Sequence, residues 1–558
     1  MRNLHKVITA SAVAALGLAL MATSVHVSAN DDKSYDANTV TDTDKVEAHD
    51  AQGNPQGKAT NNDANPADDR AQQEFWINSW DRSSKPIPQT TTDNALHVDS
   101  NTKLEKMDNT VPKMNAVWKD YTHDADGNNS YDSTNNVNTP AVNFKTKWML
   151  PRGFNVDKSE HGNYQGMVMA NNSIYMVESL GTGANQGAII RFDMNALKNM
   201  GLDKSANQQL LVRAFRHFST YTKAGQKRTL HFVNYLNKSD AVSAKVNRTK
   251  GRVRTQKRHV TNAHKRVRAS LRRYRKVARQ LRHAKRHARK VALRSRKRVL
   301  LRKYRATKKR QGRLIRRYHA RIRKINKLLK KQTRQLRKLN KGKQLYRAYY
   351  ELSKSITATP LINIGHGQTL AYNPKNQHLY LAQDNQLTKV DNNYYNQVTE
   401  IDPQTMQPVH QYRFKLMNNN SNMALHTLTF DNDGNAYFGV HAGPKDVKDN
   451  VYTLYTGNFS DSNVSFRPVK QMINWPGSYN QYLTYNRTNN RIYMISNDMI
   501  ISVPADRLRD GNLSNDDVHY LTYNTNREFE SLAFDDQGYG YLLTLWKSEL
   551  LHSNVPMD

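Results

Sequence analysis

The chain has 558 residues, enough for one large domain or for two to three ordinary ones. It contains no cysteine, which excludes disulfides, zinc-thiolate sites, iron-sulfur ligation and cysteine nucleophiles. Of its 85 lysine and arginine residues, 45 fall within the 110 positions from Ala241 to Tyr350, which contain no aspartate or glutamate. The remainder has 40 basic and 47 acidic residues, a net charge of about −7. One block therefore supplies the entire basic character of the protein.

Residues 1–29 have the pattern of a secretory signal peptide. Two basic residues are followed by an apolar run over 7–22 and by small residues up to Ala29, after which we expect cleavage. A retained membrane anchor is the alternative, although the run is shorter than the ~20 residues that span a bilayer. An exported chain without cysteine is more typical of a Gram-positive bacterium than of a eukaryote. We therefore expect a secreted protein or one at the bacterial cell surface.

Two segments separate this signal from the first regular pattern. Residues 30–74 are rich in Asn, Asp, Ala, Thr and Gly and poor in aliphatic residues, which predicts a disordered acidic spacer. Residues 75–143 are expected to form an N-terminal extension with loops, because the Asn/Asp/Gly composition returns near its end.

Five related segments follow, each an apolar strand, a turn rich in Asn, Asp or Gly, and a second strand centred on tyrosine. They are 165–177, 368–382, 426–439, 481–495 and 530–542. The last four central tyrosines lie 57, 56 and 48 residues apart, a spacing typical of four-stranded propeller blades. We therefore predict an all-β five-bladed β-propeller, with the first blade and a closing strand in 144–201 and the other blades in 356–558.

Residues 202–355 are predicted to form a basic helical insertion in this propeller. Apolar residues recur every seven positions in one seam that contains Val253, Val260 and Val267 and in another that contains Ile315 and Ile322. The two registers do not run together, and Gly312 offers a break, which favours a long, coiled-coil-like α-helical hairpin. One continuous helix is the alternative.

The charge of this insertion predicts a polyanion-binding surface, because exposed Arg and Lys pair with phosphate or sulfate and release counterions. The fourteen residues we select are Arg272, Arg273, Arg275, Lys276, Arg286, Arg289, Arg296, Arg298, Arg316, Arg317, Arg321, Arg323, Lys330 and Lys331. Candidate partners are teichoic acid, anionic lipid, extracellular nucleic acid and glycosaminoglycan. An intracellular DNA target is not expected, given the export signal. A solvated helical stalk without a partner is the alternative.

A second candidate site consists of the polar residues that open the repeats. In a propeller the first strand of each blade lines the central channel, so these side chains would surround one mouth of it. They are Gln165, Gln368, His426, Gln481 and Glu530, with His366 nearby. One interpretation is a site for a glycan or another polar ligand; the other is a set of amides that seal the channel.

Nothing in the sequence indicates catalysis, a cofactor or a metal. No Gly-x-Ser-x-Gly, His-Glu-x-x-His, phosphate-binding loop or dinucleotide fingerprint is present. The polar positions contain one carboxylate, Glu530, whereas glycoside hydrolysis needs two. A hydrolase acting on extracellular polysaccharide nevertheless stays open as an alternative.

The repeat motifs also resemble those of a known family. Gly365-His366-Gly367-Gln368-Thr369, the segment 431–437 and Glu528-Phe529-Glu530-Ser531-Leu532 look like signatures of the helveticin J-like proteins, large bacteriocins and related secreted proteins of lactobacilli. The resemblance covers about half the chain, and it implies a five-bladed propeller and antagonism of related bacteria. The main prediction is thus a secreted, non-enzymatic binding protein of the cell envelope. An adhesin to host mucus or glycosaminoglycan would use the same surfaces.

Overall fold

A computed structural model describes the chain over 87–98, 128–151, 163–179, 186–202, 209–218, 223–359, 362–384, 387–390, 392–418, 421–441, 452–472, 480–545 and 547–558, with short pieces at 48–49, 55–56, 104, 106–107, 111–112 and 477. The predicted signal peptide and nearly all of the predicted spacer lie outside these residues. The described residues form two units. The helical unit is Leu230–Gln344, and the sheet unit contains the residues up to Thr229 and from Leu345 onward.

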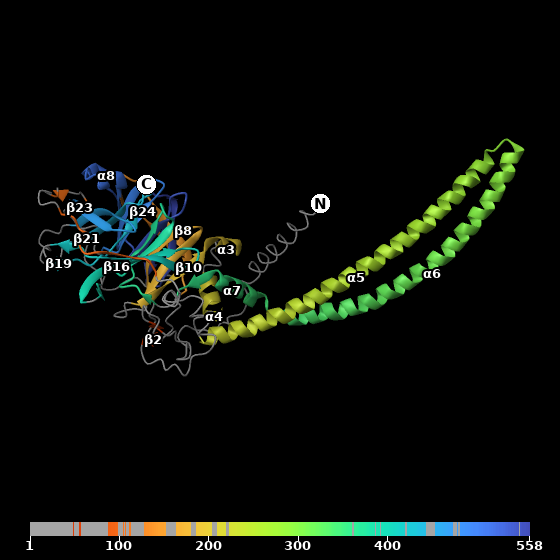
Figure 1. Cartoon of the computed structure of the whole chain (residues 1–558), viewed down its shortest axis with the longest axis horizontal. Coiled ribbons are helices and arrows are strands. Elements are labelled where there is room, and N and C mark those ends of the chain that lie inside the picture. Colours follow the sequence, from red (N-terminus) through yellow and green to blue (C-terminus); the bar gives the residue numbers. More distant parts are fainter. Residues whose placement is uncertain are drawn as a thin grey trace. The chain divides into compact units, whose positions relative to one another are not determined.

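The sheet unit contains five sheets of five or six strands (Figure 1). The first, in the order β11-β10-β9-β8 with β12 beside β10, consists of β8 (Asn163–Ala170), β9 (Ser173–Ser179), β10 (Gln186–Asp193), β11 (Ile356–Ala358) and β12 (Ile362–Asn363). The second, in the order β13-β14-β16-β17-β3 with β15 beside β16, consists of β3 (Gln89–Thr92), β13 (Leu370–Asn373), β14 (His378–Ala382), β15 (Thr388–Val390), β16 (Asn393–Asp402) and β17 (Gln407–Phe414).

The other three sheets have the same plan. The third, β20-β21-β22-β23-β4, consists of β4 (Lys106–Met107), β20 (Thr429–Phe430), β21 (Ala436–His441), β22 (Tyr452–Phe459) and β23 (Val464–Met472). The fourth, β24-β25-β26-β27-β6, consists of β6 (Asn135–Val137), β24 (Tyr482–Asn486), β25 (Arg491–Ser496), β26 (Met499–Pro504) and β27 (His519–Thr522). The fifth, β28-β29-β30-β7-β5, consists of β5 (Ser130–Asp132), β7 (Asn143–Met149), β28 (Glu528–Phe534), β29 (Tyr539–Leu545) and β30 (Glu549–Pro556).

Short elements complete the sheet unit. Two pairs of two-residue strands are β1 (Ala48–His49) with β2 (Pro55–Gln56), and β18 (Met417–Asn418) with β19 (Ser421–Asn422). The helices are α3 (Met194–Asn199), α4 (Leu210–Phe218), α7 (Gln344–Lys354), α8 (Ala505–Arg509) and the 3₁₀ turn η8 (Asn515–Asp517), besides the start of α5.

The prediction of an all-β five-bladed β-propeller is wrong. Hydrogen bonding divides the described strands among separate open sheets, none of which closes on itself, and long helices occupy much of the chain. The repeats do predict strand-turn-strand units, because their alternation and turn residues are local features. How such units associate depends on contacts between sheets and on strands outside the repeats, which a repeat period does not encode.

The first strands of the five sheets lie against one another, which positions the candidate site. β8 contacts β13 and β28, β13 contacts β20, and β24 contacts both β20 and β28. The backbones come close, since Gly166 N–H donates to Gly367 O at 3.0 Å. A Cβ on Gly166 would lie 2.6 Å from Gln368 O, so this approach requires glycine.

Residues of the predicted N-terminal extension cover the outer edges of four sheets. β3 and β4 pair parallel with β17 and β23, and β6 and β5 pair antiparallel with β27 and β7. β7 in turn pairs with β30, which joins the segment before the first repeat to the last strand of the chain. An exposed sheet edge is a template for aggregation, so these additions protect the sheets.

The apolar core lies between consecutive sheets, where the central tyrosines of the repeats are buried. Several of their hydroxyls form hydrogen bonds. Tyr175 donates to Pro403 O at 2.8 Å, Tyr437 donates to Asp431 Oδ2 at 2.8 Å, and Tyr493 accepts from Asn489 Nδ2 at 2.9 Å. A buried tyrosine combines a large apolar area with a satisfied polar end, which explains its recurrence in the repeats.

The helical unit lies within one connection of the first sheet. β10 and β11 are hydrogen-bonded neighbours, with Ile190 opposite Ala358 and Phe192 opposite Ile356, and the helices lie between them in the sequence. α5 (Lys223–Arg282) has 60 residues and α6 (His287–Asn340) has 54, so they extend about 90 and 80 Å at 1.5 Å per residue. Arg, Lys, Ala and Leu favour helix, and the block contains no proline.

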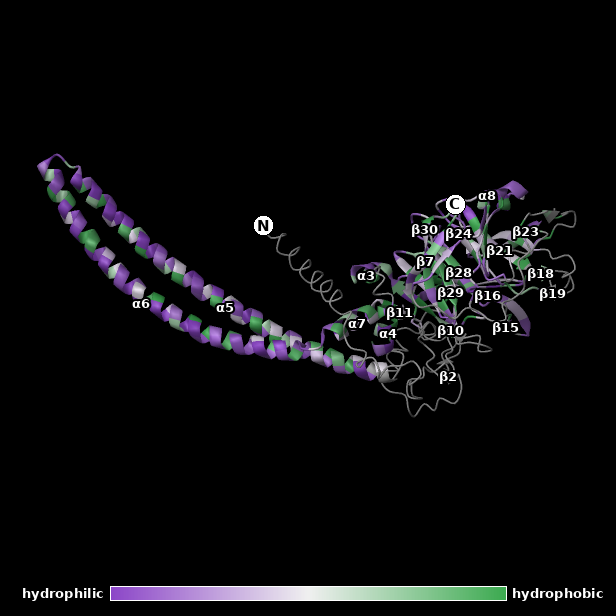
Figure 2. Ribbon diagram, turned by 180° about the vertical axis from the view of Figure 1, so that it is seen from behind, coloured by the Kyte–Doolittle hydropathy of each residue, from purple (hydrophilic) through white to green (hydrophobic). Residues whose placement is uncertain are grey.

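The two helices run antiparallel as a pair (Figures 1 and 2). Tyr235 OH donates to Asn340 Oδ1 at 2.7 Å near the base. Farther along, Tyr274 stacks on Tyr304 with ring centroids 6.4 Å apart. The heptad seams face inward, since Val277 is buried, and a hairpin rather than one continuous helix is present.

The turn of the hairpin lies at 283–286, between α5 and α6, and not at Gly312. Gly312 lies inside α6, and a Cβ there would meet no atom within 4 Å. The turn contains neither glycine nor proline, so no local signal marks it. Contacts between the helices set its place, whereas Gly342, with φ +72°, follows the end of α6 as a conventional helix stop.

Candidate functional site

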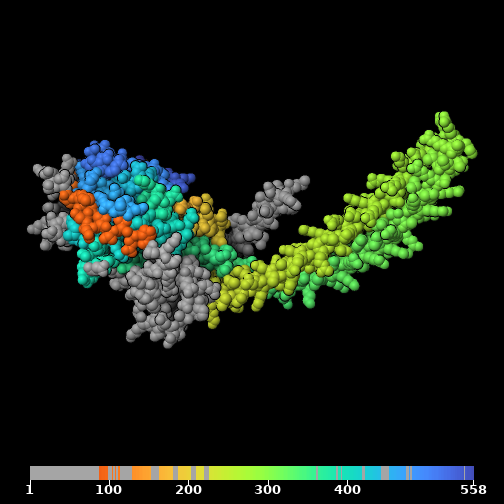
Figure 3. Space-filling view, in the orientation of Figure 1, coloured from red at the N-terminus to blue at the C-terminus, as the bar shows by residue number. Residues whose placement is uncertain are grey.

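The helical unit has a continuous cationic surface. Its two helices are hydrophilic along most of their length, and side chains project from both (Figures 2 and 3). All fourteen predicted polyanion-binding residues are exposed, from Arg272 in α5 to Lys331 in α6. From Ala241 to Gln344 no acidic residue is present to pair with them. The surface therefore lacks internal charge compensation over most of its length.

The cations surround the pair rather than forming one stripe. In α5, Arg272, Arg273, Arg275 and Lys276 flank Tyr274, whose ring faces α6. At 100° per residue these four side chains point to every side except the seam. A long flexible anion can therefore contact the helices from several directions.

The structure brings the predicted polar residues together; Gln165, Gln368, His426, Gln481 and Glu530 are here called the polar cluster. Gln368 Nε2 donates to Gln481 Oε1, and Glu530 interacts with both Gln165 and Gln368. His426 Nε2 bonds to the carbonyl oxygen of Asn480, next to Gln481, at 2.6 Å. The four residues other than His426 are buried.

His366 lies beside this cluster at an exposed position. Surrounding groups displace water from its ring and lower its pKa from the ordinary value. Burial also lowers the pKa of His426, and the neighbouring His366 lowers it further. Both rings are therefore neutral at neutral pH.

Two carboxylates that the sequence analysis did not select accompany the cluster. Asp384 is fully buried beyond the end of β14, where Oδ1 accepts from Gly367 N–H at 2.8 Å and Oδ2 lies 3.9 Å from His426 Nδ1. Burial raises the pKa of Asp384 to about 8. Glu528 opens β28 and interacts with Glu530, and burial together with Glu528 raises the pKa of Glu530 well above its ordinary value.

The Glu-Phe-Glu spacing could have indicated Glu528 as a neighbour of Glu530, because alternate residues of a strand share a face. No comparable signal marks Asp384, which follows a second strand rather than a first. Among the described residues, no three His, Asp or Glu side chains are grouped closely enough to hold a metal ion.

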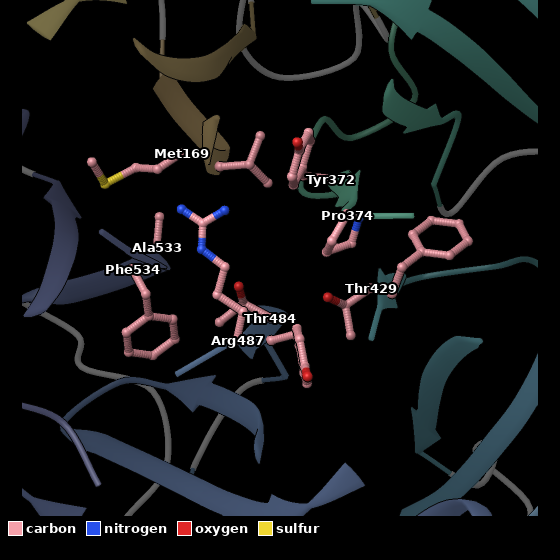
Figure 4. Close-up of a pocket in the computed structure, with 11 residues that line it drawn as sticks. Met169, Tyr372, Pro374, Thr429, Thr484, Arg487, Ala533 and Phe534 are labelled. Atoms are coloured by element: carbon pink, nitrogen blue, oxygen red, sulfur yellow. The ribbon is translucent and has the colours of Figure 1, made fainter. Parts of the chain in front are cut away.

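A pocket lies at the opposite end of the first strands (Figure 4). Its cavity volume is about 40 Å³, and its lining includes residues three or four positions after the polar position of every repeat. Arg487 points its guanidinium toward Met169 and Ala533, and it forms an ion pair with Asp536. The remaining lining residues are Val168, Tyr372, Pro374, Thr429, Phe430, Thr484, Tyr485 and Phe534. The pocket thus combines apolar and aromatic side chains with two threonines and one cation.

No protein-family model matches the chain, and no curated protein matches it in sequence. The resemblance to the helveticin J-like proteins therefore stays a prediction. Within the described residues, no helix combines the length and the apolar character needed to cross a membrane.

Proposed function

We propose that this protein is secreted and binds anionic polymers of the bacterial cell envelope through its helical unit. The observation that supports this most is the long helix pair whose exposed Arg and Lys have no acidic partner from Ala241 to Gln344. Like charges three or four residues apart on a helix repel one another, and a phosphate-rich polymer relieves that repulsion. Binding also releases the counterions of the polymer.

Wall teichoic acid is the partner that fits best. Eleven of the fourteen selected residues are arginine, whose planar guanidinium makes paired hydrogen bonds to phosphate. The expected secretion places the protein where such polymers occur. DNA and heparin present phosphate or sulfate as well, so they are comparison ligands in the experiment.

The main experiment uses a symmetrically shortened hairpin. The contacts between Tyr235 and Asn340 and between Tyr274 and Tyr304 show which residues face one another, and by the same register Lys245 lies nearly opposite Gln332. Replacing residues 246–331 with a short Gly-Ser turn keeps the base of the pair and leaves the sheet unit intact. Binding of full-length and shortened protein to purified teichoic acid, DNA and heparin is measured across a salt series. We expect the shortened protein to lose salt-sensitive binding.

A second variant separates charge from length. Replacing the fourteen Arg and Lys residues with Gln keeps good helix formers in place but removes their charge. We expect weaker binding and a shallower dependence of log Kd on log salt concentration, by close to one unit per lost phosphate contact. Equal binding by full-length and charge-removed protein would show that the helix pair is only a spacer.

Glycoside hydrolysis by the polar cluster is less well supported. Glu528 supplies the second carboxylate, but it interacts with Glu530 at hydrogen-bonding range. Retaining and inverting glycosidases separate their carboxyl groups by about 5 Å or more, which leaves room for the sugar or water. We expect no product release from a panel of polysaccharides, whether or not Glu530 is replaced with Gln.

Antagonism of related bacteria, which the helveticin J-like resemblance implies, is a proposal with its own test. Growth inhibition of lactobacilli by full-length but not shortened protein would link killing to envelope binding. Envelope binding without inhibition would separate the two.

A further inference from the structure

Two glutamates and a glutamine meet where β28 lies beside β8. Glu530 is 2 % exposed and Gln165 is 4 % exposed, and the two side chains interact. Glu528 lies two residues before Glu530 on the same strand and interacts with it. Three oxygen-bearing side chains from two sheets therefore come together, two of them buried and Glu528 partly buried.

Two of these side chains each have an oxygen without a partner. Glu530 Oε2 and Gln165 Oε1 are buried, and neither has a hydrogen-bond partner among the described atoms. A buried acceptor without a donor costs free energy, and a carboxylate costs more than an amide. Among the described residues, no Lys, Arg or His forms an ion pair with Glu530; Arg527, three positions earlier, is paired with Glu549. The convergence thus lacks a positive charge.

Gln368 and Gln165 hydrogen-bond to the Glu530 side chain, but no described group donates to Glu530 Oε2 or to Gln165 Oε1. Gln368 directs Nε2 to Gln481 Oε1. Ser531, the residue after Glu530, donates its hydroxyl to the carbonyl oxygen of Gln165 at 2.8 Å. That bond holds β8 against β28 beside Glu530.

We propose that Glu528, Glu530 and Gln165 bind a calcium ion, with water completing its coordination. Calcium is a hard cation that takes six to eight oxygen ligands from carboxylates, amide carbonyls and water in irregular geometry. Magnesium requires near-ideal octahedral geometry, and transition metals favour nitrogen or sulfur ligands that this set lacks. Two carboxylates balance the charge of the ion, and Gln165 Oε1 supplies a neutral ligand. The ion would join the first and fifth sheets.

Calorimetric titration of full-length protein, after treatment with EDTA, tests this site directly. We expect calcium to bind with one site per chain and magnesium to bind far more weakly. The thermal midpoint of the sheet unit, followed by tryptophan fluorescence, should rise by several degrees in calcium because only the folded state holds the ligands together. All six tryptophans lie outside Leu230–Gln344, so the signal does not arise from the helical unit, and Trp148 is buried in β7 of the sheet unit.

Variants locate the ion. Glu530→Gln should abolish the calcium heat and the shift in midpoint. Gln165→Glu adds a carboxylate and should tighten calcium binding, which a purely structural role for Gln165 would not produce. The matched control is Glu351→Gln, which changes a carboxylate that is 54 % exposed on α7 and should leave calcium binding unchanged.

Two results would overturn the proposal. One is the absence of calcium binding at millimolar concentration together with a stability that rises on acidification. That result would mean that a shared proton, and not calcium, neutralises the two glutamates. The other is calcium binding that persists in Glu530→Gln, which would place the ion elsewhere.

Discussion

The two units of this protein differ in the burial and pairing of their charged residues. In the sheet unit, Arg527 and Glu549 are fully buried and paired at 2.9 Å, and further hydrogen bonds surround them. In the helical unit, the cations from Ala241 to Gln344 are largely exposed, and no acidic residue lies among them in the sequence. A buried charge needs a partner within the fold, whereas an exposed one is solvated and free to bind an external anion.

This difference in charge pairing gives the two units different roles in stability and in binding. Pairing within the sheet unit fixes positions, as where Glu549 also accepts from Asn129 Nδ2 and so connects β30 to the segment before β5. The two helices of the helical unit are held together by a narrow apolar seam, and their exposed charges are free to bind an external anion. Stability should therefore depend on single residues in the sheet unit, and binding should depend on many residues together in the helical unit.

The largest effect is expected from breaking the buried pair. Arg527→Met leaves Glu549 charged and buried, and should lower the free energy of unfolding of the sheet unit by about 3–5 kcal/mol. Urea denaturation followed by tryptophan fluorescence measures it. The control is Arg509→Met, which removes an exposed pair with Asp510 and should cost about 0–1 kcal/mol. Equal costs for the two variants would show that burial does not determine how much each ion pair contributes to stability.

The next effect concerns Asp384 and depends on pH. Because its pKa in the folded state, about 8, exceeds its ordinary value of 3.8, the folded state binds the proton more tightly. The free energy of unfolding should therefore fall as pH rises toward 8 and level off above it. Asp384→Asn should remove this fall and stabilise the sheet unit at pH 9, relative to the wild type, on the order of a few kcal/mol.

Urea midpoints of wild type and variant between pH 6.5 and 9 measure this change. The lowered pKa values of His366 and His426 affect the profiles of wild type and variant alike, so the difference between the two profiles reports Asp384. Parallel pH profiles for the two proteins would show that Asp384 is ionised in the fold.

The polar cluster and the buried charges show which parts of the site the sequence could predict and which it could not. The polar cluster was predictable because its members occupy one repeated position, and equivalent positions of equivalent strands come together. Arg527 and Asp384 occupy no repeated position, and their burial depends on partners as far away in the chain as Glu549 and His426. Such pairing leaves no trace in local composition.

The fold shows the same limit. Strand and helix periodicities are local, so the strand-turn-strand repeats and the inward seam containing Val277 were predictable. The association of the sheets was not predictable, and the propeller inferred from the repeat period was wrong. The short edge strands β3 and β4 were not predicted either, because two to four residues carry no measurable alternation. The position of the hairpin turn at 283–286 was not predicted, because the turn contains no glycine or proline.

A smaller effect is expected within the seam of the helical unit. Val277 is 5 % exposed, and Val277→Ala should cost about 1 kcal/mol, because lost burial exceeds the helix propensity gained. Val299 is 47 % exposed, so Val299→Ala should instead add a few tenths of a kcal/mol. Thermal unfolding followed by circular dichroism at 222 nm shows whether the two substitutions change the stability of the helical unit in opposite directions. The same sign for both would mean that the seam does not hold the pair together.

The smallest effect tests whether the base of the helix pair relies on redundant polar contacts, in contrast to the single buried pair of the sheet unit. Tyr235 OH and Ser239 Oγ both donate to Asn340 Oδ1, at 2.7 and 2.9 Å. Tyr235→Phe leaves the acceptor satisfied by Ser239, so it should cost under about 0.5 kcal/mol, and Ser239→Ala should behave alike. Together they leave a partly buried oxygen unpaired and should cost about 1–2 kcal/mol. A double-mutant cycle measures this coupling, and additive costs would show that each hydroxyl acts alone.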